Sequence, residues 1–259
     1  MTRPPKIMYR ELLIEIGCEE LPASWLPSLT RQIGDSVGSQ LAAARLDCPL
    51  PPEPFGTPRR LVVRVAKVAD RQADLEETLT GPPIRAAFDA DGQPTRAALG
   101  FARKNGVEVA RLSQVETPKG DYLAYQRRER GAAARSVLGG VLAAVLRDLA
   151  FAKQMHWDAR LEDGRGDLLF GRPIRWLLFL FGGRVVPFVI DRTPGALARG
   201  VAPIRAGAKT YGHRFFAKEG TPGRGFRVGS FAEYRTGLKR RYVLLSREER
   251  RARIEQKLG

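Results

Sequence analysis

The sequence predicts an α+β fold in which mixed and antiparallel sheets pack against amphipathic helices. Apolar residues alternate with period two in segments 11–16 and 61–66, as they do in half-buried strands. They recur every three or four residues in segments 24–41 and 133–150, which is typical of helices with one buried face. Gly182 and Gly183 separate two apolar segments, a spacing that indicates a β-hairpin.

The first two predicted strands belong to one sheet, and the amphipathic helix between them is expected to pack on that sheet. The strand at 11–16 ends at Gly17, and Ser24 is the expected N-cap of the following helix. That helix tolerates Pro27 because a proline in the first turn removes no intrahelical hydrogen bond. A proline-rich loop then leads to the second strand at 61–66.

The middle of the chain predicts a small helical lobe. Large apolar residues become rarer between 81 and 106, and a short helix is expected at 95–105. Strands are expected at 107–109 and 122–126, on the two sides of a turn at Lys119-Gly120. The long apolar helix expected at 133–150 follows the lobe in the sequence.

Two apolar strands, expected at 168–181 and 184–190, complete the main region.

The predicted domain organisation has four parts. They are a main α+β region formed by 1–75 with 120–215, the small helical lobe at 76–119, a basic loop at 216–235, and the start of a further helical domain at 236–259.

A capping box marks the beginning of the last helix. In Ser246-Arg247-Glu248-Glu249 the serine and glutamate side chains can satisfy each other's free backbone N–H groups. The helix has room for only about three turns before Gly259, and an isolated helix of that length is marginal. We therefore expect the natural polypeptide to continue beyond Gly259, so that this chain is cut short.

Charge is concentrated in the last quarter of the chain. The 44 Lys and Arg residues and 28 Asp and Glu residues give a formal net charge of +16. Segment 192–259 holds 17 basic and 5 acidic residues, so it carries +12 of that charge. Such a block favours a polyanionic partner. The final helix lacks the apolar face of a membrane-surface helix, so nucleic acid is the preferred partner, and a solvated basic surface is the alternative.

Several other classes of protein are excluded by what the sequence lacks. No apolar segment is long enough for a membrane helix and no secretory signal is recognisable, so a cytoplasmic location and no membrane partner are expected. The two cysteines and two histidines do not have a metal-ligand spacing, and no metal site is expected. Phosphate-loop and dinucleotide motifs are missing, as is any recognisable catalytic triad, so no catalytic residue is assigned.

Arginines and aromatic residues form two patterns that suit RNA. Arg172 and Arg175 lie at the start of an apolar strand, and His213 and Arg214 are surrounded by aromatic residues. Guanidinium and aromatic planes can contact phosphates or stack on bases. The alternative is that the arginines bond strand ends within the fold while the aromatic rings join the core. The RNA-binding candidates are Arg172, Arg175, His213, Arg214, Lys239, Arg240 and Arg241.

Residues 13–22, LIEIGCEELP, closely resemble the opening of the beta subunit of the bacterial two-subunit glycyl-tRNA synthetase. Further short matches to that family follow in order until about Ile254. They are Thr57-Pro58-Arg59-Arg60-Leu61, Gly81-Pro82, Ala87-Phe88-Asp89, Gly92, Ala102-Arg103, Lys119-Gly120, Met155, Trp157, Arg172-Pro173-Ile174-Arg175-Trp176 and Gly212-His213-Arg214-Phe215. The chain departs from the family in a longer segment at 191–209 and in Cys18, where threonine is more usual.

The resemblance implies a division of labour. The class II core that makes glycyl-adenylate from glycine and ATP, with Mg, lies on a separate alpha subunit in this family. The beta subunit binds and positions tRNA(Gly) in an alpha2-beta2 assembly. It is therefore expected that this chain is the N-terminal part of a non-catalytic, tRNA-binding subunit of glycine-tRNA ligase and binds no cofactor of its own.

Two other functions remain open from the residues alone. One is a free-standing RNA-binding module without a role in aminoacylation. The other is an enzyme acting on a small anionic substrate, which needs converging catalytic residues that this sequence does not display.

Overall fold

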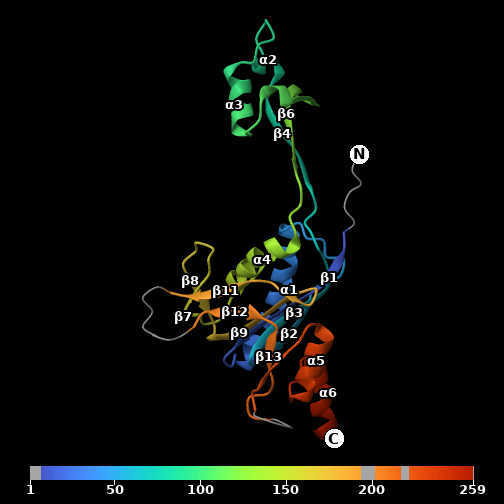
Figure 1. The fold of residues 1–259 in the computed structure, drawn as a ribbon, viewed down its shortest axis with the longest axis vertical. Helices are drawn as coiled ribbons and strands as arrows, with labels where there is room; N and C mark the ends of the chain where they lie inside the picture. Colours follow the sequence, from blue (N-terminus) through green and yellow to red (C-terminus); the bar gives the residue numbers. More distant parts are fainter. Residues whose placement is uncertain (1–6, 194–201, 217–221, 259) are drawn as a thin grey trace. The chain divides into compact units, whose positions relative to one another are not determined.

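The computed structural model describes residues 7–193, 202–216 and 222–258. The chain forms two compact units. Unit 1 comprises Met1–Gln72 with Ala132–Gly259, and unit 2 comprises Ala73–Gly131. Each unit has its own sheet and helices (Figure 1).

Unit 1 is built on a mixed sheet, which has nine strands among the described residues, in the order β2-β3-β1-β9-β12-β11-β7-β8 with β10 paired to β9. All pairs are antiparallel except β12 with β9. The strands are β1 (Tyr9–Cys18), β2 (Glu53–Thr57), β3 (Arg60–Ala69), β7 (Met155–Arg160), β8 (Asp167–Phe170), β9 (Ile174–Phe181), β10 (Arg184–Val185), β11 (Val189–Arg192) and β12 (Ile204–Gly207).

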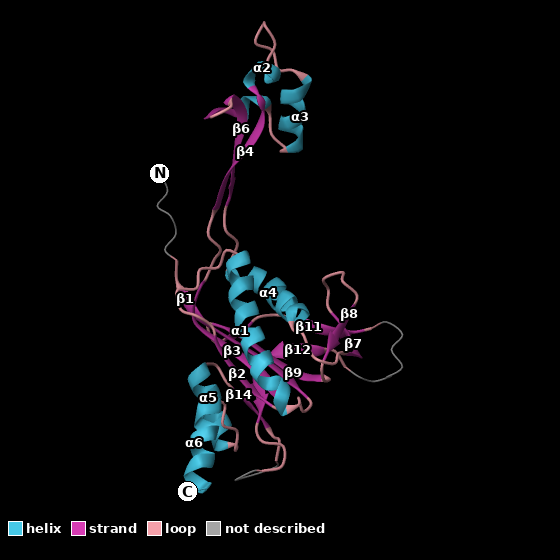
Figure 2. Cartoon of the chain, turned by 180° about the vertical axis from the view of Figure 1, so that it is seen from behind, coloured by secondary structure: helices cyan, strands magenta, loops and turns pink. Residues whose placement is uncertain are grey.

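Helices cover both faces of this sheet because β1, β3 and β9 are apolar on both faces. One face packs on α1 (Leu26–Ala43) and α4 (Ala134–Asp148), which lie side by side in Figure 2. The other face packs on α5 (Phe231–Arg240). A short pair, β13 (Lys209–Tyr211) with β14 (Gly225–Arg227), and a last helix, α6 (Arg247–Leu258), complete the described part of unit 1. A 3₁₀ turn, η1 (Ala23–Trp25), precedes α1.

Unit 2 combines a small antiparallel sheet with short helices. Its strands follow the order β4-β6-β5, and Phe101 and Leu123 pack around a core that also contains Ala87 and Ala98. The elements are β4 (Leu75–Pro83), α2 (Ile84–Ala87), α3 (Arg96–Lys104), η2 (Val109–Arg111), β5 (Ser113–Thr117) and β6 (Gly120–Glu129). The lobe that the sequence predicted as helical therefore includes a three-stranded sheet among its described residues.

The predicted α+β class is confirmed, as are the helices at 95–105 and 133–150 and the hairpin at Gly182-Gly183. Prolines explain why the two long apolar strands are each divided. Pro173 and Pro187 lack the N–H that a central ladder needs, so 168–181 forms β8 and β9 and 184–190 forms β10 and the beginning of β11.

Two local predictions were wrong, and a third was confirmed only in part. Ser24 lies in η1, and no side chain caps α1. Residues 107–109 form no strand, because the turn that pairs Thr117 with Gly120 sets β5 at Ser113–Thr117. The capping box forms only half of its contacts: Ser246 Oγ accepts from Glu249 N at 3.2 Å, but the Glu249 carboxylate binds Lys239 instead.

The extended segment at 191–209 and the basic loop at 216–235 both fall partly outside the described residues. The described part of 191–209 includes β12, and the described part of 216–235 includes β14 and the first turn of α5. None of the described helices is long and apolar enough to cross a membrane.

Candidate nucleic-acid interface

Four segments that are distant in the sequence meet at the end of β1. The Cys18 N–H donates to the Arg59 carbonyl at 2.9 Å, and the Glu19 N–H donates to the Pro173 carbonyl at 3.0 Å. The fourth segment follows β13 and brings Arg214 to the same place. The fold thus gathers the chain around Glu19 with the segments near 59, 173 and 214.

Glu19 and Glu20 are the centre of a set of arginines. Arg175 Nε lies 2.6 Å from a Glu19 carboxylate oxygen, and Arg214 Nη1 lies 2.9 Å from Glu20 and 3.5 Å from Glu19. Arg59 lies 3.7 Å from Glu19 and 3.5 Å from Glu20. We call Arg59, Arg172, Arg175 and Arg214, together with these two carboxylates, the arginine cluster.

The charges of the arginine cluster stabilise one another. Partial burial opposes the charge of Glu20, but the hydrogen bond from Arg214 and the charge of Arg59 lower the pKa of the Glu20 carboxyl. The same hydrogen bond raises the pKa of Arg214. Both groups are therefore charged at neutral pH. Three guanidinium groups, those of Arg59, Arg175 and Arg214, pair with the two carboxylates, so the cluster retains a net positive charge.

The two arginines of the 172–176 motif differ in what they contact. Arg172 donates from Nε to the Glu20 carbonyl at 3.1 Å and from Nη1 to the Gly171 carbonyl at 3.3 Å, and its guanidinium lies over Trp25. This arginine bonds the ends of strands within the fold, which is the alternative that the sequence left open. Arg175 is 56% exposed, so much of its guanidinium faces solvent although it pairs with Glu19.

A buried polar pair lies beneath the cluster. Arg60 Nη1 donates to Glu15 at 3.0 Å, and both side chains are almost fully buried. Thr210 Oγ1 also donates to Glu15 at 2.9 Å, and Arg60 Nη2 donates to the Tyr211 carbonyl at 2.8 Å. Burial opposes the charge of Arg60, but the interactions with Glu15 and Tyr234 together raise the pKa of Arg60. The pair thereby ties β13 to the central strands β1 and β3.

Apolar and aromatic surroundings exclude water from this pair. The Arg59 and Arg60 guanidinium groups lie over the Trp176 ring, each 5.5 Å from the ring centroid. The Trp176 and Tyr211 ring centroids are 4.9 Å apart. Burial raises the pKa of the nearby Cys18 thiol to about 12. Cys18 is therefore a neutral, structural thiol.

The segment after β13 is held by its backbone on both sides. The His213 N–H donates to the Arg241 carbonyl at 2.9 Å, and the His213 carbonyl accepts from Gly223 N at 2.8 Å. The His213 Nδ1 atom accepts from the N–H groups of Phe215 and Phe216, both at 3.1 Å. Since Nδ1 is an acceptor, Nε2 carries the ring hydrogen.

The remaining candidates lie at the C-terminal end of α5. Lys239 Nζ is paired with Glu249 at 2.7 Å, and Arg240 is exposed. The Arg241 guanidinium stacks 4.0 Å from the Phe226 centroid and donates to the Gly237 carbonyl. Through the Arg241 carbonyl this end of α5 is joined to His213, whereas Lys239 and Arg240 remain on the surface.

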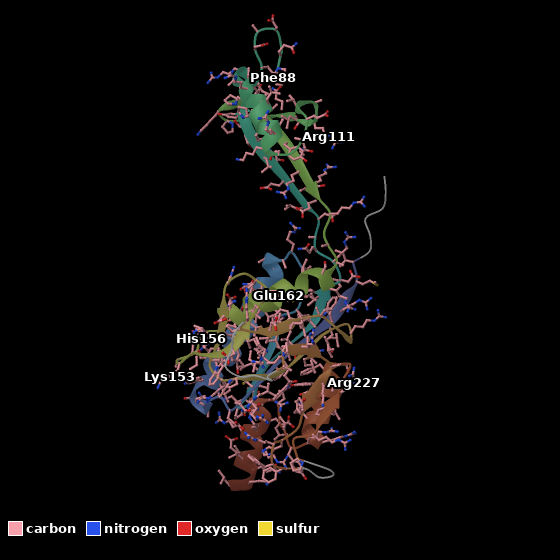
Figure 3. The ribbon with its side chains drawn as sticks, turned by 60° about the vertical axis from the view of Figure 1, so that its left-hand side comes forward. Phe88, Arg111, Lys153, His156, Glu162 and Arg227 are labelled. Carbon is pink, nitrogen blue, oxygen red and sulfur yellow. The ribbon has the colours of Figure 1, made fainter. Side chains whose placement is uncertain are left out.

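His156 does not belong to this region. It lies on β7, 69% exposed and 3.5 Å from Asp167, and Figure 3 shows it on the opposite side of unit 1 from Arg227. Within the described residues no group of three or more His, Cys, Asp or Glu side chains could hold a metal ion.

The sequence prediction missed the acidic half of the cluster. Glu19, Glu20 and Arg59 belong to the matched motifs, but nothing in a local pattern shows that residues near 20, 59, 175 and 214 meet. It also missed Phe216 and Tyr242, which are 61% and 52% exposed. The signal available in the sequence was the presence of aromatic residues within a basic stretch.

Comparison with known proteins gives a consistent result. The family model described as glycyl-tRNA synthetase beta subunit matches residues 12–259. The glycine–tRNA ligase beta subunits of Syntrophus aciditrophicus and Moorella thermoacetica are 38% and 39% identical over 244 and 251 residues. These alignments cover 94% and 97% of this chain and 32% and 33% of those relatives. The chain thus spans about a third of the length of the curated relatives it matches.

Proposed function

The chain belongs to the glycyl-tRNA synthetase beta-subunit family, and from this premise we propose that it is the N-terminal part of a non-catalytic, tRNA-binding subunit of glycine–tRNA ligase. In this proposal a separate alpha subunit attaches glycine to its tRNA with ATP and Mg. The present chain contributes binding surface for tRNA(Gly) within a cytoplasmic alpha2-beta2 assembly.

The observation that carries the proposal is the convergence of matched motifs on the arginine cluster. Segments 13–22, 57–61, 172–176 and 212–215 all resemble the family, and their charged residues meet around Glu19 and Glu20. Arg175 and Arg214 keep about half of their side-chain surface exposed. Guanidinium groups that are already oriented and partly exposed can bind phosphate oxygens with little loss of side-chain freedom.

The charge distribution supports the same proposal. Phosphate contacts by Lys and Arg dominate the affinity of proteins for nucleic acids. The arginine cluster and the exposed Arg240 belong to one unit, and most of the positive charge of the chain lies between 192 and 259. A tRNA is a polyanion, so its charge is opposite in sign to that of this chain.

Glycylation of a tRNA(Gly) transcript by a purified alpha subunit tests the proposal. The assay is supplemented with this chain or with the chain extended to its natural stop. Restoration of activity by the extended form alone is expected, because the relatives are about three times longer. Restoration by neither form, with both proteins folded, would contradict the proposal and favour a free-standing RNA-binding module.

Binding measured at several salt concentrations tests the residues themselves. The double variant Arg175→Gln/Arg214→Gln is expected to weaken tRNA binding and to lower the salt slope by about two units, one for each lost phosphate contact. Arg128→Gln is the matched control, since Arg128 is 71% exposed and lies in unit 2. An unchanged slope in the double variant would remove Arg175 and Arg214 from the interface.

A further inference from the structure

Three large aromatic side chains lie exposed beside the arginine cluster. Phe215, Phe216 and Tyr242 have exposed fractions of 71%, 61% and 52%. Phe216 joins the group to His213 at 4.6 Å between ring centroids and to Tyr242 at 6.2 Å. The Arg214 guanidinium lies 5.5 Å from the Phe215 centroid. We call these three rings with His213 the aromatic ledge.

The backbone of the ledge is fixed although its rings are exposed. The hydrogen bonds of His213 with Arg241 and Gly223, and those of its Nδ1 atom with Phe215 and Phe216, hold the backbone of residues 213–216 in place. Exposed apolar rings add little to the stability of the fold, because folding does not remove them from water. They are, however, already oriented for a planar ligand, which lowers the entropic cost of binding.

Tyr242 occupies a backbone position that ordinarily favours glycine. The N–H of Val243 donates to the Leu238 carbonyl and that of Tyr242 to the Lys239 carbonyl, which is the Schellman arrangement at the end of α5. Tyr242 is the left-handed residue of that arrangement, with φ at 60°. A side chain is strained there. The fold therefore retains an exposed tyrosine at a position where glycine would be more stable.

Among the residues that the structure describes, cations and no unpaired carboxylate border the ledge. Arg224 follows Gly223, whose N–H donates to the His213 carbonyl. Arg240 lies two residues before Tyr242 in the sequence. Both arginines are exposed. In the described part of the chain neither forms an ion pair, and the nearby Glu19 and Glu20 are neutralised by arginines. Aromatic rings among cations suit the bases and phosphates of an unpaired strand better than the mixed surface of a protein.

We propose that the aromatic ledge is a stacking site for unpaired nucleotides, with Phe216 and Tyr242 as the rings on which bases stack. The proposal rests on the proposed tRNA-binding function and specifies which part of an RNA this surface takes. The bases of a duplex are already stacked on each other, so the ledge discriminates single-stranded RNA or a tRNA loop or end from a helix.

Fluorescence anisotropy with three RNA probes tests this proposal on the 259-residue chain. The probes are a single-stranded RNA of about 12 nucleotides, a blunt duplex of the same length and a tRNA(Gly) transcript. Phe216→Ala and Tyr242→Gly are each expected to weaken single-strand binding about tenfold, since stacking on one ring is lost. Duplex binding and the salt slope should be unchanged because no cation is removed.

Tyr242→Gly also separates binding from folding. Glycine relieves the left-handed strain, so the Tm of this variant is expected to equal or exceed that of the parent chain. Met155→Ala is the matched control, because Met155 is 52% exposed and lies on β7, away from the ledge. Its affinity for all three probes should match that of the parent.

The possible outcomes distinguish this proposal from the one on which it rests. If Phe216→Ala and Tyr242→Gly bind single-stranded RNA like the parent while Arg175→Gln/Arg214→Gln weakens tRNA binding, the stacking site is refuted and the tRNA-binding function stands. Binding of no RNA by the folded parent chain would overturn both. Ledge variants that keep RNA affinity but no longer assemble with a purified alpha subunit on gel filtration would assign the ledge to a protein interface instead.

Discussion

At the residue scale, the feature that most strongly determines the geometry of the site is the buried pair of Glu15 and Arg60. It lies between the sheet and the segment that carries His213, and it bonds both the side chain of Thr210 and the carbonyl of Tyr211. The buried Glu15–Arg60 pair therefore holds in place the segment that carries part of the arginine cluster and of the aromatic ledge. A buried charge that loses its partner is strongly destabilising, whereas an exposed pair contributes little.

Arg60→Met is expected to lower the free energy of unfolding by about 3–5 kcal/mol, because the Glu15 carboxylate loses its counter-charge while remaining buried. Urea unfolding followed by circular dichroism measures this change. Arg175→Met is the matched control, and its exposed pair with Glu19 should cost less than about 1 kcal/mol. Similar values for the two variants would show that the Glu15–Arg60 pair is no more important than a surface pair.

At the element scale, the close approach of β1 and β9 brings the Trp176 ring onto the backbone of Gly17. A Cβ atom at Gly17 would lie 1.9 Å from the ring, so the ring or the backbone would have to move to accept it. Trp176 in turn supports the guanidinium groups of Arg59 and Arg60. The glycine is thus required for close packing rather than for an unusual backbone angle, and it connects the strand pairing with the arginine cluster.

Gly17→Ala is expected to destabilise unit 1 by about 3 kcal/mol, since the indole must move or the two strands must separate. Thermal unfolding gives the loss of stability, and a change in tryptophan fluorescence reports movement of an indole. Gly140→Ala on α4 is the control: its Cβ would meet no atom within 4 Å, so alanine should stabilise the helix by about 0.5–1 kcal/mol. Equal Tm values for both variants would contradict the packing argument.

At the scale of the whole molecule, unit 2 is an insertion between two segments that are paired within unit 1. The Gln72 N–H donates to the Ala132 carbonyl at 2.9 Å, and Arg71 forms a β-bridge with Ala133. The apolar core of unit 2 around Ala87, Ala98 and Leu123 is separate from the two cores of unit 1. Each core is buried by residues of its own unit, so the two units can fold independently.

Replacement of residues 73–131 by a short glycine–serine linker is expected to leave unit 1 folded, with a cooperative unfolding transition and a Tm within about 5 °C of the parent. The closely spaced ends at Gln72 and Ala132 make the loop easy to close. Calorimetry measures the transition, and a linker variant without a cooperative transition would show that unit 1 depends on unit 2. Retained tRNA binding by the shortened chain would place the interface in unit 1.

The sequence by itself determined the features that neighbouring residues encode. Periodicity defined the α+β class and α4, helix-stop and turn signals indicated α3 and the hairpin at Gly182, and ordered short motifs indicated the family. The same local signals failed where a single proline, a cap or a turn had to compete with long-range pairing, as at Ser24 and at 107–109. Local patterns carry only the preferences of a segment, and pairing decides among them.

Only the tertiary structure decided which chemical groups meet. Arg214 and Glu20 are separated by 194 residues, and Thr210 and Glu15 by 195, so no pattern within a segment could reveal either contact. It also placed Arg172 on backbone carbonyls within the fold, left Arg175 half exposed, and brought Phe216 beside Tyr242. The physical reason is that strand order and register, which determine these contacts, depend on the packing of the whole sheet between its two layers of helices.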